Sequence, residues 1–286
     1  RSFTNRLRCV INMTLDSWQI WDNTAWLNNI QSIYTYDANN NLVSELRQSG
    51  NGSLWDNYAL YTMSYDENNN LLIEIGQLWN SSAWENASQY IYTYDLYNNP
   101  VSYLSQYWSD NEWINSNLYT YVYNENNSVI STKIQVCIDG EWYNNSLISL
   151  SYDGNNNCIS NLYQDWSWAD SSFVNSQLHT YTYNVSNYRT SDLLQSWDGS
   201  QWINSQLYNF SYDGNNNLTL SILQYWEITD WLNARLYSAT YDENNFLVSE
   251  ANKTWYSYGP FFIFGDSTHF YFRTVMGIND PPLSDK

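Results

Sequence analysis

The stretch Trp84-Glu85-Asn86, continued by Tyr92-Thr93-Tyr94-Asp95, an asparagine-rich turn and Gln106-Tyr107-Trp108, decides the fold of this 286-residue chain. Its pattern occurs eight times along the sequence. The tyrosine before the turn recurs after 29 residues in every interval but one, in which it recurs after 31. A period of this length is typical of tandem supersecondary units that bury their hydrophobic faces against one another.

Several positions of the repeat keep the same type of residue from copy to copy. Ten residues before the tyrosine stands an aromatic residue: Trp26, Trp55, Trp84, Trp113, Trp142, Phe173, Trp202 and Trp231. The tyrosine is followed by asparagine in two copies, Asn124 and Asn184, and by an acid in the others: Asp37, Asp66, Asp95, Asp153, Asp213 and Asp242. Twelve residues after the tyrosine stands a glutamine in all copies but the last. The two extra residues of the long interval lie between Trp166 and Phe173, where we expect a loop.

Side chains alternate with a period of two through the first half of each repeat. The alternation predicts one face formed by Trp113, Asn115, Asn117, Tyr119, Tyr121 and Tyr123, and an opposite face formed by Ile114, Ser116, Leu118, Thr120 and Val122. Such alternation, rich in aromatic and β-branched residues, predicts a strand. The asparagines that follow tolerate the left-handed backbone of a tight hairpin, and a second apolar run comes next, as in residues 71–79.

We therefore predict an all-β fold of tandem β-hairpin repeats, eight copies of a 29-residue period. The repeats are expected to form an open, twisted β-spiral or solenoid-like antiparallel sheet of about seventeen strands. The predicted organisation is a partial repeat or N-terminal cap over residues 1–25, the array over 26–255, C-terminal capping strands over 256–275, and a linker to a missing sorting domain over 276–286. The pattern does not specify which residues of two paired strands lie opposite one another, and therefore does not specify which faces meet.

Charge and composition exclude several classes of partner. The net charge is −19, with 10 Lys and Arg residues, so nucleic acid and anionic membranes are repelled. No apolar run of about 18 residues occurs, so the sequence predicts no membrane span. Self-association, other surface proteins and neutral glycans remain as candidate partners.

The stretch Tyr34-Thr35-Tyr36-Asp37, with a turn and Leu42, resembles the YD repeat of Rhs and teneurin-type proteins. Tyr92-Thr93-Tyr94-Asp95 and Tyr212-Asp213 resemble it as well. The resemblance covers about residues 15–255 and implies a β-hairpin that winds into a spiralling sheet. This chain differs at the turn, where Asn40-Asn41 replaces the common Gly-Arg, and in its Trp-x-Asn motif, which is not a family signature.

A second resemblance lies near the end of the chain. Phe270-Tyr271-Phe272-Arg273-Thr274, followed by Gly277-Ile278-Asn279-Asp280, looks like the junction before the sorting domain of proteins exported by the type IX secretion system of Bacteroidota. This resemblance implies a location outside the cell or on its surface.

The repeated acids have two readings. Asn replaces Asp in two copies, as a turn-forming hydrogen bond allows, so we interpret the acids as structural residues of the turn. The alternative is calcium binding by oxygen clusters such as Asp66-Glu67-Asn68-Asn69-Asn70, although no bidentate Glu stands at a fixed offset. Calcium is thus the one candidate cofactor, and we predict no other metal site.

The tryptophans also have two readings. They are interpreted as packing groups between repeats, with ladders of Asn and Gln beside them. The alternative is a carbohydrate-binding surface formed by Trp26, Trp55, Trp84, Trp113, Trp142, Trp202 and Trp231, because aromatic rings with nearby amides bind sugars. The two readings are compatible, since an array can expose some of its rings.

No catalytic residue can be named from the sequence. His179 takes the place of a repeat tyrosine, and no spacing of Ser, His and Asp predicts a triad. We therefore predict a secreted or cell-surface, non-enzymatic repeat protein that acts as an adhesin or as a structural component of a surface or filament. The alternatives are a carbohydrate-binding repeat array and, third, a glycoside hydrolase that uses two of the carboxylates.

Overall fold

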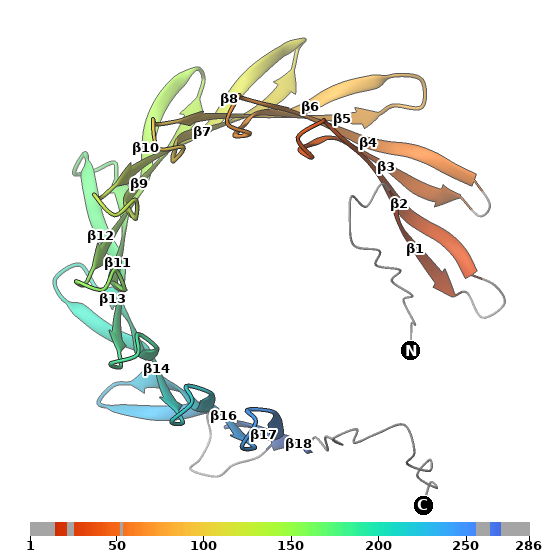
Figure 1. The fold of residues 1–286 in the computed structure, drawn as a ribbon. Coiled ribbons are helices and arrows are strands. Elements are labelled where there is room, and N and C mark those ends of the chain that lie inside the picture. Colours follow the sequence, from red (N-terminus) through yellow and green to blue (C-terminus); the bar gives the residue numbers. More distant parts are fainter. Residues whose placement is uncertain (1–14, 22–25, 52–53, 256–263, 270–286) are drawn as a thin grey trace, which may run out of the picture. The chain divides into compact units, whose positions relative to one another are not determined.

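The structure is a computed structural model, and it describes residues 15–21, 26–51, 54–255 and 264–269. These residues form eighteen strands joined by turns (Figure 1). The first strands of the eight repeats are β2 (Trp26–Tyr36), β4 (Leu54–Tyr65), β6 (Trp84–Tyr94), β8 (Glu112–Tyr123), β10 (Glu141–Tyr152), β12 (Ser172–Tyr183), β14 (Trp202–Tyr212) and β16 (Asp230–Tyr241). The second strands are β3 (Leu42–Asn51), β5 (Leu71–Trp79), β7 (Pro100–Ser109), β9 (Val129–Ile138), β11 (Cys158–Ser167), β13 (Arg189–Trp197), β15 (Leu218–Glu227) and β17 (Leu247–Thr254).

Two strands flank the eight hairpins. β1 (Leu15–Trp21) pairs with β2 in the register of a second repeat strand, with Trp21 opposite Trp26. β18 (Phe264–His269) pairs antiparallel with β17 and is the part of the expected capping region that the structure describes. The expected linker over 276–286 and the sequence that resembles an export junction lie outside the described residues.

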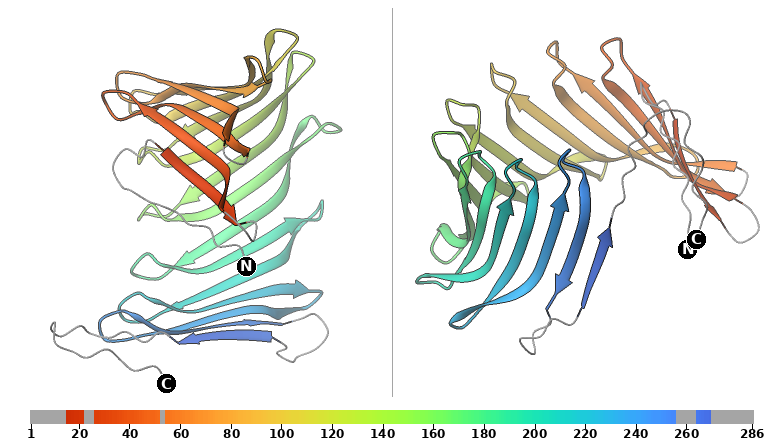
Figure 2. Two further views of the ribbon diagram at one scale, coloured as in Figure 1. Left: turned by 90° about the vertical axis from the view of Figure 1, so that its right-hand side faces the viewer. Right: turned by 60° about the horizontal axis from the view of Figure 1, so that its bottom comes forward.

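By compactness the chain divides into two units, Arg1–Leu147 and Ile148–Lys286, with the boundary inside β10. Within each unit, strands that follow one another in the chain pair antiparallel, so each unit is an open antiparallel meander (Figure 2). The predicted all-β class, the tandem hairpins and the open antiparallel arrangement are confirmed. The long interval is also a loop as expected, because β11 ends at Ser167 and β12 begins at Ser172.

A β-bulge near the middle of seven of the eight first strands, β2, β4, β6, β8, β12, β14 and β16, reverses the alternation of their side chains. Asn117 lies opposite Ser105, but Asn115 lies opposite the next residue, Gln106, so Ser116 is an extra residue in β8. An extra residue in one strand shifts the side-chain parity of everything beyond it. The prediction that Trp113 and Asn115 share a face with Tyr119 is therefore wrong.

The bulge gives the sheet two distinct faces. We call the tryptophan face the one that carries Trp84, Asn86, Ile91, Gln106 and Trp108, and the tyrosine face the one that carries Tyr90, Tyr92, Tyr94, Tyr103 and Tyr119. Cross-strand partners share a face, and the side-chain contacts agree with this assignment: Trp108 meets Trp113, whereas Tyr103 meets Tyr119.

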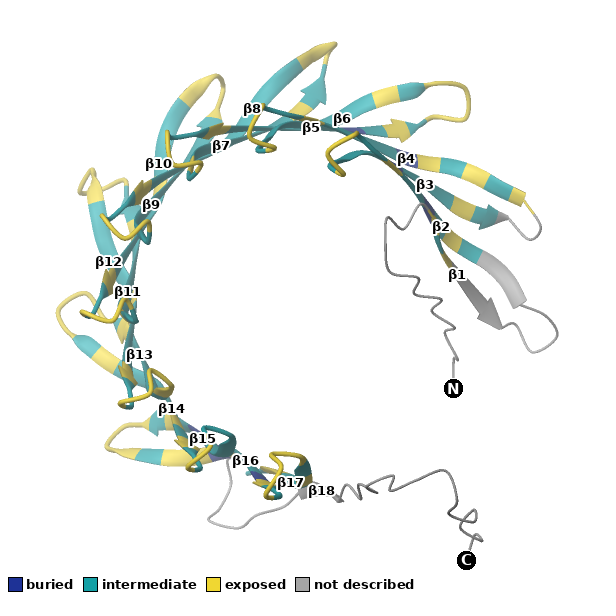
Figure 3. Ribbon diagram, viewed as in Figure 1, coloured by how far each residue is buried: buried dark blue, intermediate teal, exposed yellow. Residues whose placement is uncertain are grey.

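Each unit is built as a single layer, so neither face is fully covered (Figure 3). Among the described residues, the buried apolar side chains are small ones and one leucine: Ala59, Leu223, Ala234 and Ala239. No large side chain in the described part of the chain is fully buried. Stability therefore depends on contacts between side chains of neighbouring strands along each face.

Candidate functional site

The acid after the repeat tyrosine holds the turn of its hairpin. Asp37 accepts hydrogen bonds through Oδ1 from the main-chain N–H groups of Asn39 and Asn41, both at 2.8 Å, and through Oδ2 from the Asn41 side chain at 3.0 Å. Asp66, Asp95, Asp153 and Asp213 accept the same three bonds in their own turns. The bond from the Asn41 side chain is the main reason why the pKa of Asp37 is lowered.

Two copies of the turn explain why the acid is sometimes an amide. Where the fifth turn residue is Ser128 or Tyr188, the first is Asn124 or Asn184, and its Oδ1 still accepts both main-chain bonds at 2.9–3.0 Å. Asp242, whose fifth residue is Phe246, likewise accepts both main-chain bonds through Oδ1, at 2.9 Å. An amide therefore suffices for the Oδ1 bonds that all eight turns share, whereas the side-chain bond to Oδ2 needs both an acid at the first position and an asparagine at the fifth.

The fourth residue of every turn is an asparagine with a left-handed backbone, with φ between 57° and 66°: Asn40, Asn69, Asn98, Asn127, Asn156, Asn187, Asn216 and Asn245. Glycine adopts this conformation more easily, but asparagine adds a bond to the preceding repeat. Nδ2 of Asn41 donates to Oδ1 of Asn69 at 2.8 Å, and Asn70 donates to Asn98 at the same distance. This bond accounts for the absence of the glycine that the YD repeat commonly has.

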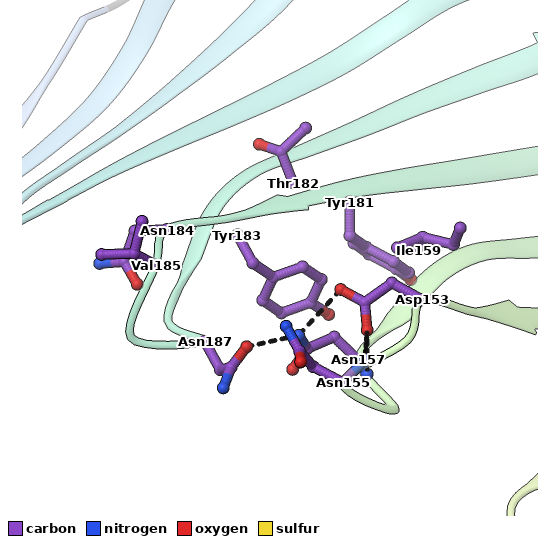
Figure 4. Close-up of a pocket in the computed structure, with 10 residues that line it drawn as sticks. All are labelled: Asp153, Asn155, Asn157, Ile159, Tyr181, Thr182, Tyr183, Asn184, Val185 and Asn187. Carbon is purple, nitrogen blue, oxygen red and sulfur yellow. Dashed lines mark hydrogen bonds between the residues drawn. The ribbon is translucent and has the colours of Figure 1, made fainter.

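Figure 4 shows two successive turns of the second unit around a hollow of about 260 Å³. Asn157 donates through Nδ2 both to Asp153 within its turn and to Asn187 of the next turn, at 3.0 Å and 2.8 Å. The polar groups of this hollow thus hold the turns together.

The repeat tyrosine links each hairpin to the one before it. The phenol of Tyr65 donates to the carbonyl oxygen of Leu42 at 2.8 Å, and that of Tyr94 donates to Leu71 at 2.9 Å. The same bond joins Tyr123 to Pro100, Tyr183 to Cys158, Tyr212 to Arg189 and Tyr241 to Leu218. The tyrosine of the Tyr-Asp pair that resembles the YD repeat therefore joins one hairpin to the preceding one.

The repeated glutamine pairs with the asparagine of the Trp-x-Asn motif across neighbouring strands. Gln77 Nε2 donates to Asn86 Oδ1 at 3.0 Å, and Gln106 donates to Asn115 at 2.8 Å. The five other glutamines make the same bond: Gln48 to Asn57, Gln135 to Asn144, Gln164 to Asn175, Gln195 to Asn204 and Gln224 to Asn233. These pairs form the expected amide ladder.

Beside five of the seven amide pairs, two aromatic rings meet edge to face. Trp79 and Trp84 have ring centroids 5.0 Å apart, and Trp108 and Trp113 have theirs 4.9 Å apart, with interplanar angles of 61° and 70°. Equivalent pairs join Trp166 to Phe173, Trp197 to Trp202 and Trp226 to Trp231. Six of the candidate glycan-binding residues are half-buried: Trp55, Trp84, Trp113, Trp142, Trp202 and Trp231. The side chain of Trp26 lies outside the described residues.

The tryptophan end of each hairpin projects beyond the continuous sheet. Pairing between β6 and β7 stops at Ser88 opposite Tyr107, whereas pairing between β5 and β6 continues to Trp79 opposite Trp84. We call this projecting part, from the glutamine to the asparagine that it bonds, a finger; Gln77–Asn86 is one and Gln106–Asn115 is the next (Figure 2). A cleft of about 700 Å³ separates these two, lined by Gln77, Trp84, Glu85, Asn86, Trp108, Ser109, Asp110 and Asn111.

The tyrosine face of the first unit carries an ionic cluster. Glu45, which is 9% exposed, accepts hydrogen bonds from Ser32 at 2.9 Å and from Arg47 at 2.6 and 3.0 Å. Burial disfavours ionisation of Glu45, but the bonds from Arg47 and Ser32 outweigh it and lower the pKa. Burial and the nearby charge of Glu45 raise the pKa of Glu74. The Arg47 guanidinium lies 4.6 Å from the ring centre of Tyr61.

The second unit has one comparable cluster. His179 Nδ1 lies 2.9 Å from Asp192, whose other oxygen is 3.3 Å from Arg189. The imidazole also stacks at 5.9 Å on Tyr181, in the place of a repeat tyrosine. Asp192 thus joins a side chain of the neighbouring strand β12 to Arg189 of its own strand, β13.

Within the described residues, no three His, Cys, Asp or Glu side chains come together as a metal site would require. Cys137 and Cys158 are free thiols. Across the same part of the chain, no helix has the length and apolar character that a membrane crossing takes.

Comparison with known proteins gives structural similarities only. No protein-family model and no curated protein matches the chain. A DUF3836 family protein from Bacteroides vulgatus is 31% identical over 30% of this chain and 90% of its own, with a TM-score of 0.25. TcdB2-TccC3 matches 86% of this chain and 16% of its own at 11% identity and a TM-score of 0.40. A porin-like protein from Bacteroides uniformis matches 83% of this chain and 93% of its own at 9% identity, with a TM-score of 0.35. These scores are too low to carry an argument about ligand or activity.

The structure thus uses the predicted site residues in two ways. The turn acids and the Gln–Asn ladder bond to neighbouring residues, whereas pairs of tryptophans from successive fingers line a cleft. Sequence reasoning missed the Glu45–Arg47 cluster. Four of the eight repeats carry an acid at the position of Glu45, namely Glu45, Glu74, Asp192 and Glu250, but Arg47 is the one base at its repeat position, so Arg47 was the available signal.

Proposed function

We propose that the chain is a secreted or cell-surface, non-enzymatic, YD-like repeat protein that acts as an adhesin or as a structural component of a surface layer or filament. One observation carries the proposal: side chains that recur along the repeats are used in bonds to the neighbouring repeat. The Tyr94 phenol, the Asn70 amide and the Gln77 amide all link one hairpin to the next. Side chains that are used in bonds between repeats have a structural role, which supports a scaffold function.

The net charge of −19 and the resemblance near the end of the chain support the surface location. A strongly acidic protein stays soluble and repels anionic surfaces. Export by a type IX system of Bacteroidota is tested by locating the protein with an antibody in intact cells of its source and in cells that lack that system. Retention inside the cell in both strains would remove the export proposal.

The scaffold role is tested with the purified chain by light scattering, electron microscopy and cell-binding assays. Self-assembly or binding to cells is the expected result. A strictly monodisperse monomer that binds neither itself, cells nor glycans would contradict it. Turnover of a glycan that is abolished by changing one carboxylate, such as Glu74→Gln, would instead favour the glycoside hydrolase alternative.

A second candidate function is a carbohydrate-binding repeat array that uses Trp, Tyr and Asn side chains. The observation that favours it is the projection of each finger beyond the continuous sheet, which leaves its tryptophans half-buried. This candidate is compatible with the first, because an adhesin needs a ligand.

A further inference from the structure

We infer that the cleft between the fingers Gln77–Asn86 and Gln106–Asn115 binds a neutral pyranose oligosaccharide, and that only clefts with a tryptophan from each of two fingers do so. This inference rests on the carbohydrate-binding candidate above and deepens it by naming the site and the class of ligand. Four features of the cleft support it: its rings, its amides, its charge and its variation along the chain.

The aromatic walls come from two successive fingers. Trp84 belongs to one finger and Trp108 to the next, and both line the same cleft on the tryptophan face. Each ring is held in place by an edge-to-face partner, Trp79 or Trp113, so neither must be ordered when a ligand binds. Preorganised rings lower the entropic cost of binding. The C–H face of a pyranose ring packs on such an indole.

The amides between the rings retain capacity for hydrogen bonds. Gln77 uses one Nε2 hydrogen on Asn86, and Asn86 accepts that bond through Oδ1. An amide side chain carries two donor hydrogens and one acceptor oxygen, so the pair keeps hydrogen-bonding capacity on both amides. Since each amide orients the other, the remaining groups have fixed directions toward the cleft. Sugar hydroxyls, which both donate and accept, match this mixture.

Charge selects a neutral ligand over an acidic one. Glu85 and Asp110 line the cleft, and no Lys or Arg does. Glu85 accepts a hydrogen bond from the side chain of Asn80 in its own finger. Uronic acids and sulfated sugars would meet two carboxylates and the field of a chain with net charge −19. A volume of about 700 Å³ fits a short segment of an oligosaccharide.

The next finger of the same unit provides an internal comparison. The position of Trp108 is taken there by Cys137, so the cleft beyond Trp113 has one tryptophan instead of two. In the second unit, Trp202 and Trp226 occupy the positions of Trp84 and Trp108. Trp55 and Trp79 of the first unit occupy these positions too. The repeat pattern therefore predicts binding at both of these pairs and weak or no binding beside Cys137.

The experiment is calorimetric titration of the intact chain with neutral β-linked hexasaccharides of glucose, xylose, mannose and N-acetylglucosamine, and with oligogalacturonate as the acidic probe. At least one neutral probe should bind, and the acidic one should not. For that probe, Trp84→Ala and Trp108→Ala should each weaken binding at the altered cleft by at least tenfold. Cys137→Ala, which leaves the number of rings in every cleft unchanged, should change affinity by less than twofold.

A gain-of-function variant keeps the test independent of folding defects. Cys137→Trp supplies the missing second ring opposite Trp113 and should raise the number of binding sites by one. Unchanged affinity together with unchanged stoichiometry in both alanine variants, or unchanged stoichiometry in Cys137→Trp, would overturn the inference. A wild-type chain that binds no neutral probe would also overturn it, together with the carbohydrate-binding candidate. The scaffold proposal would remain, because self-assembly and cell binding are measured separately.

Discussion

The phenol of Tyr94 donates a hydrogen bond to the main-chain carbonyl of Leu71, 2.9 Å away and 23 residues earlier in the chain. Six repeats make this bond from their own tyrosine within the described units. A single-layer sheet has no second layer to hold its hairpins, so bonds of this kind stabilise one hairpin on the next. The contribution of each kind of bond to the free energy of unfolding can be measured with single substitutions.

Tyr94→Phe removes the hydroxyl and leaves the ring in place. We expect the free energy of unfolding to fall by about 1 kcal/mol, and the midpoint of thermal unfolding by roughly 2–4 °C, since one net hydrogen bond is lost. The control is Tyr97→Phe, whose side chain is 76% exposed in the turn and which should leave the midpoint unchanged. Equal effects of the two changes would show that the bond to Leu71 contributes nothing.

Asn69 has a left-handed backbone, with φ of 65°, and accepts the bond from Asn41. Asn69→Gly keeps the backbone conformation and loses the bond, so a loss of about 1 kcal/mol is expected. Asn69→Ala also loses the bond, but alanine has a β-carbon that glycine lacks and no polar side chain that helps asparagine to tolerate the left-handed region, so it should be less stable than the glycine variant by roughly 1–2 kcal/mol. Urea unfolding curves measure the free energy of unfolding of both variants. An alanine variant as stable as the glycine variant would contradict this prediction.

The amide ladder is tested by a double-mutant cycle on Gln106 and Asn115, which are 2.8 Å apart. Each change to alanine leaves the partner amide without this bond, so we expect a coupling energy of about 0.5–1.5 kcal/mol. A second cycle on Gln106 and Asn86, which are not bonded to each other, serves as the control. Additive effects in the first cycle would mean that the pair is incidental to stability.

Acid should unfold the turns in a defined range of pH. The pKa values of Asp37, Asp66, Asp153 and Asp213 are lowered in the folded chain, mainly by the asparagine side chain that donates to each. The unfolded chain therefore takes up protons first as the pH falls. The stability that these groups contribute is complete above about pH 4 and is lost as the pH falls through the folded-state pKa values.

Urea midpoints measured between about pH 2 and pH 7 check this range. Asp66→Asn removes one titrating group and keeps the main-chain bonds of Oδ1, as Asn124 does naturally. We expect a shallower dependence on pH in this variant. The same slope in the wild type and in Asp66→Asn would show that the turn acids are not the groups responsible.

Removal of calcium distinguishes a structural role of the turn aspartates from a role in calcium binding. Both carboxylate oxygens of Asp37 accept bonds from donors within the turn, so we expect a chelator to change the midpoint of thermal unfolding by less than about 1 °C. Calcium added back at millimolar concentration should also have no effect. A rise of several degrees that Asp66→Asn abolishes would establish calcium binding at the turns instead.

The sequence by itself determined the strands, the turns and the repeat. A period of two, ended by a cluster of asparagines, is a local signal, and it placed the second strand at Leu71–Trp79 as the structure has it. It also indicated that the shared aromatic and amide residues pack between repeats, because a single hairpin is marginal in water. It did not determine which side chains share a face.

Only the tertiary structure decided the faces, and the reason is the extra residue at each bulge. Alternation continues through Ser116 in the sequence, but the pairing skips it, so Asn115 and Asn117 point to opposite sides. The Glu45–Arg47 cluster and the cleft between Trp84 and Trp108 likewise depend on which strands are neighbours and where their pairing stops. Register is set by pairing between strands, and no local pattern in the chain specifies it.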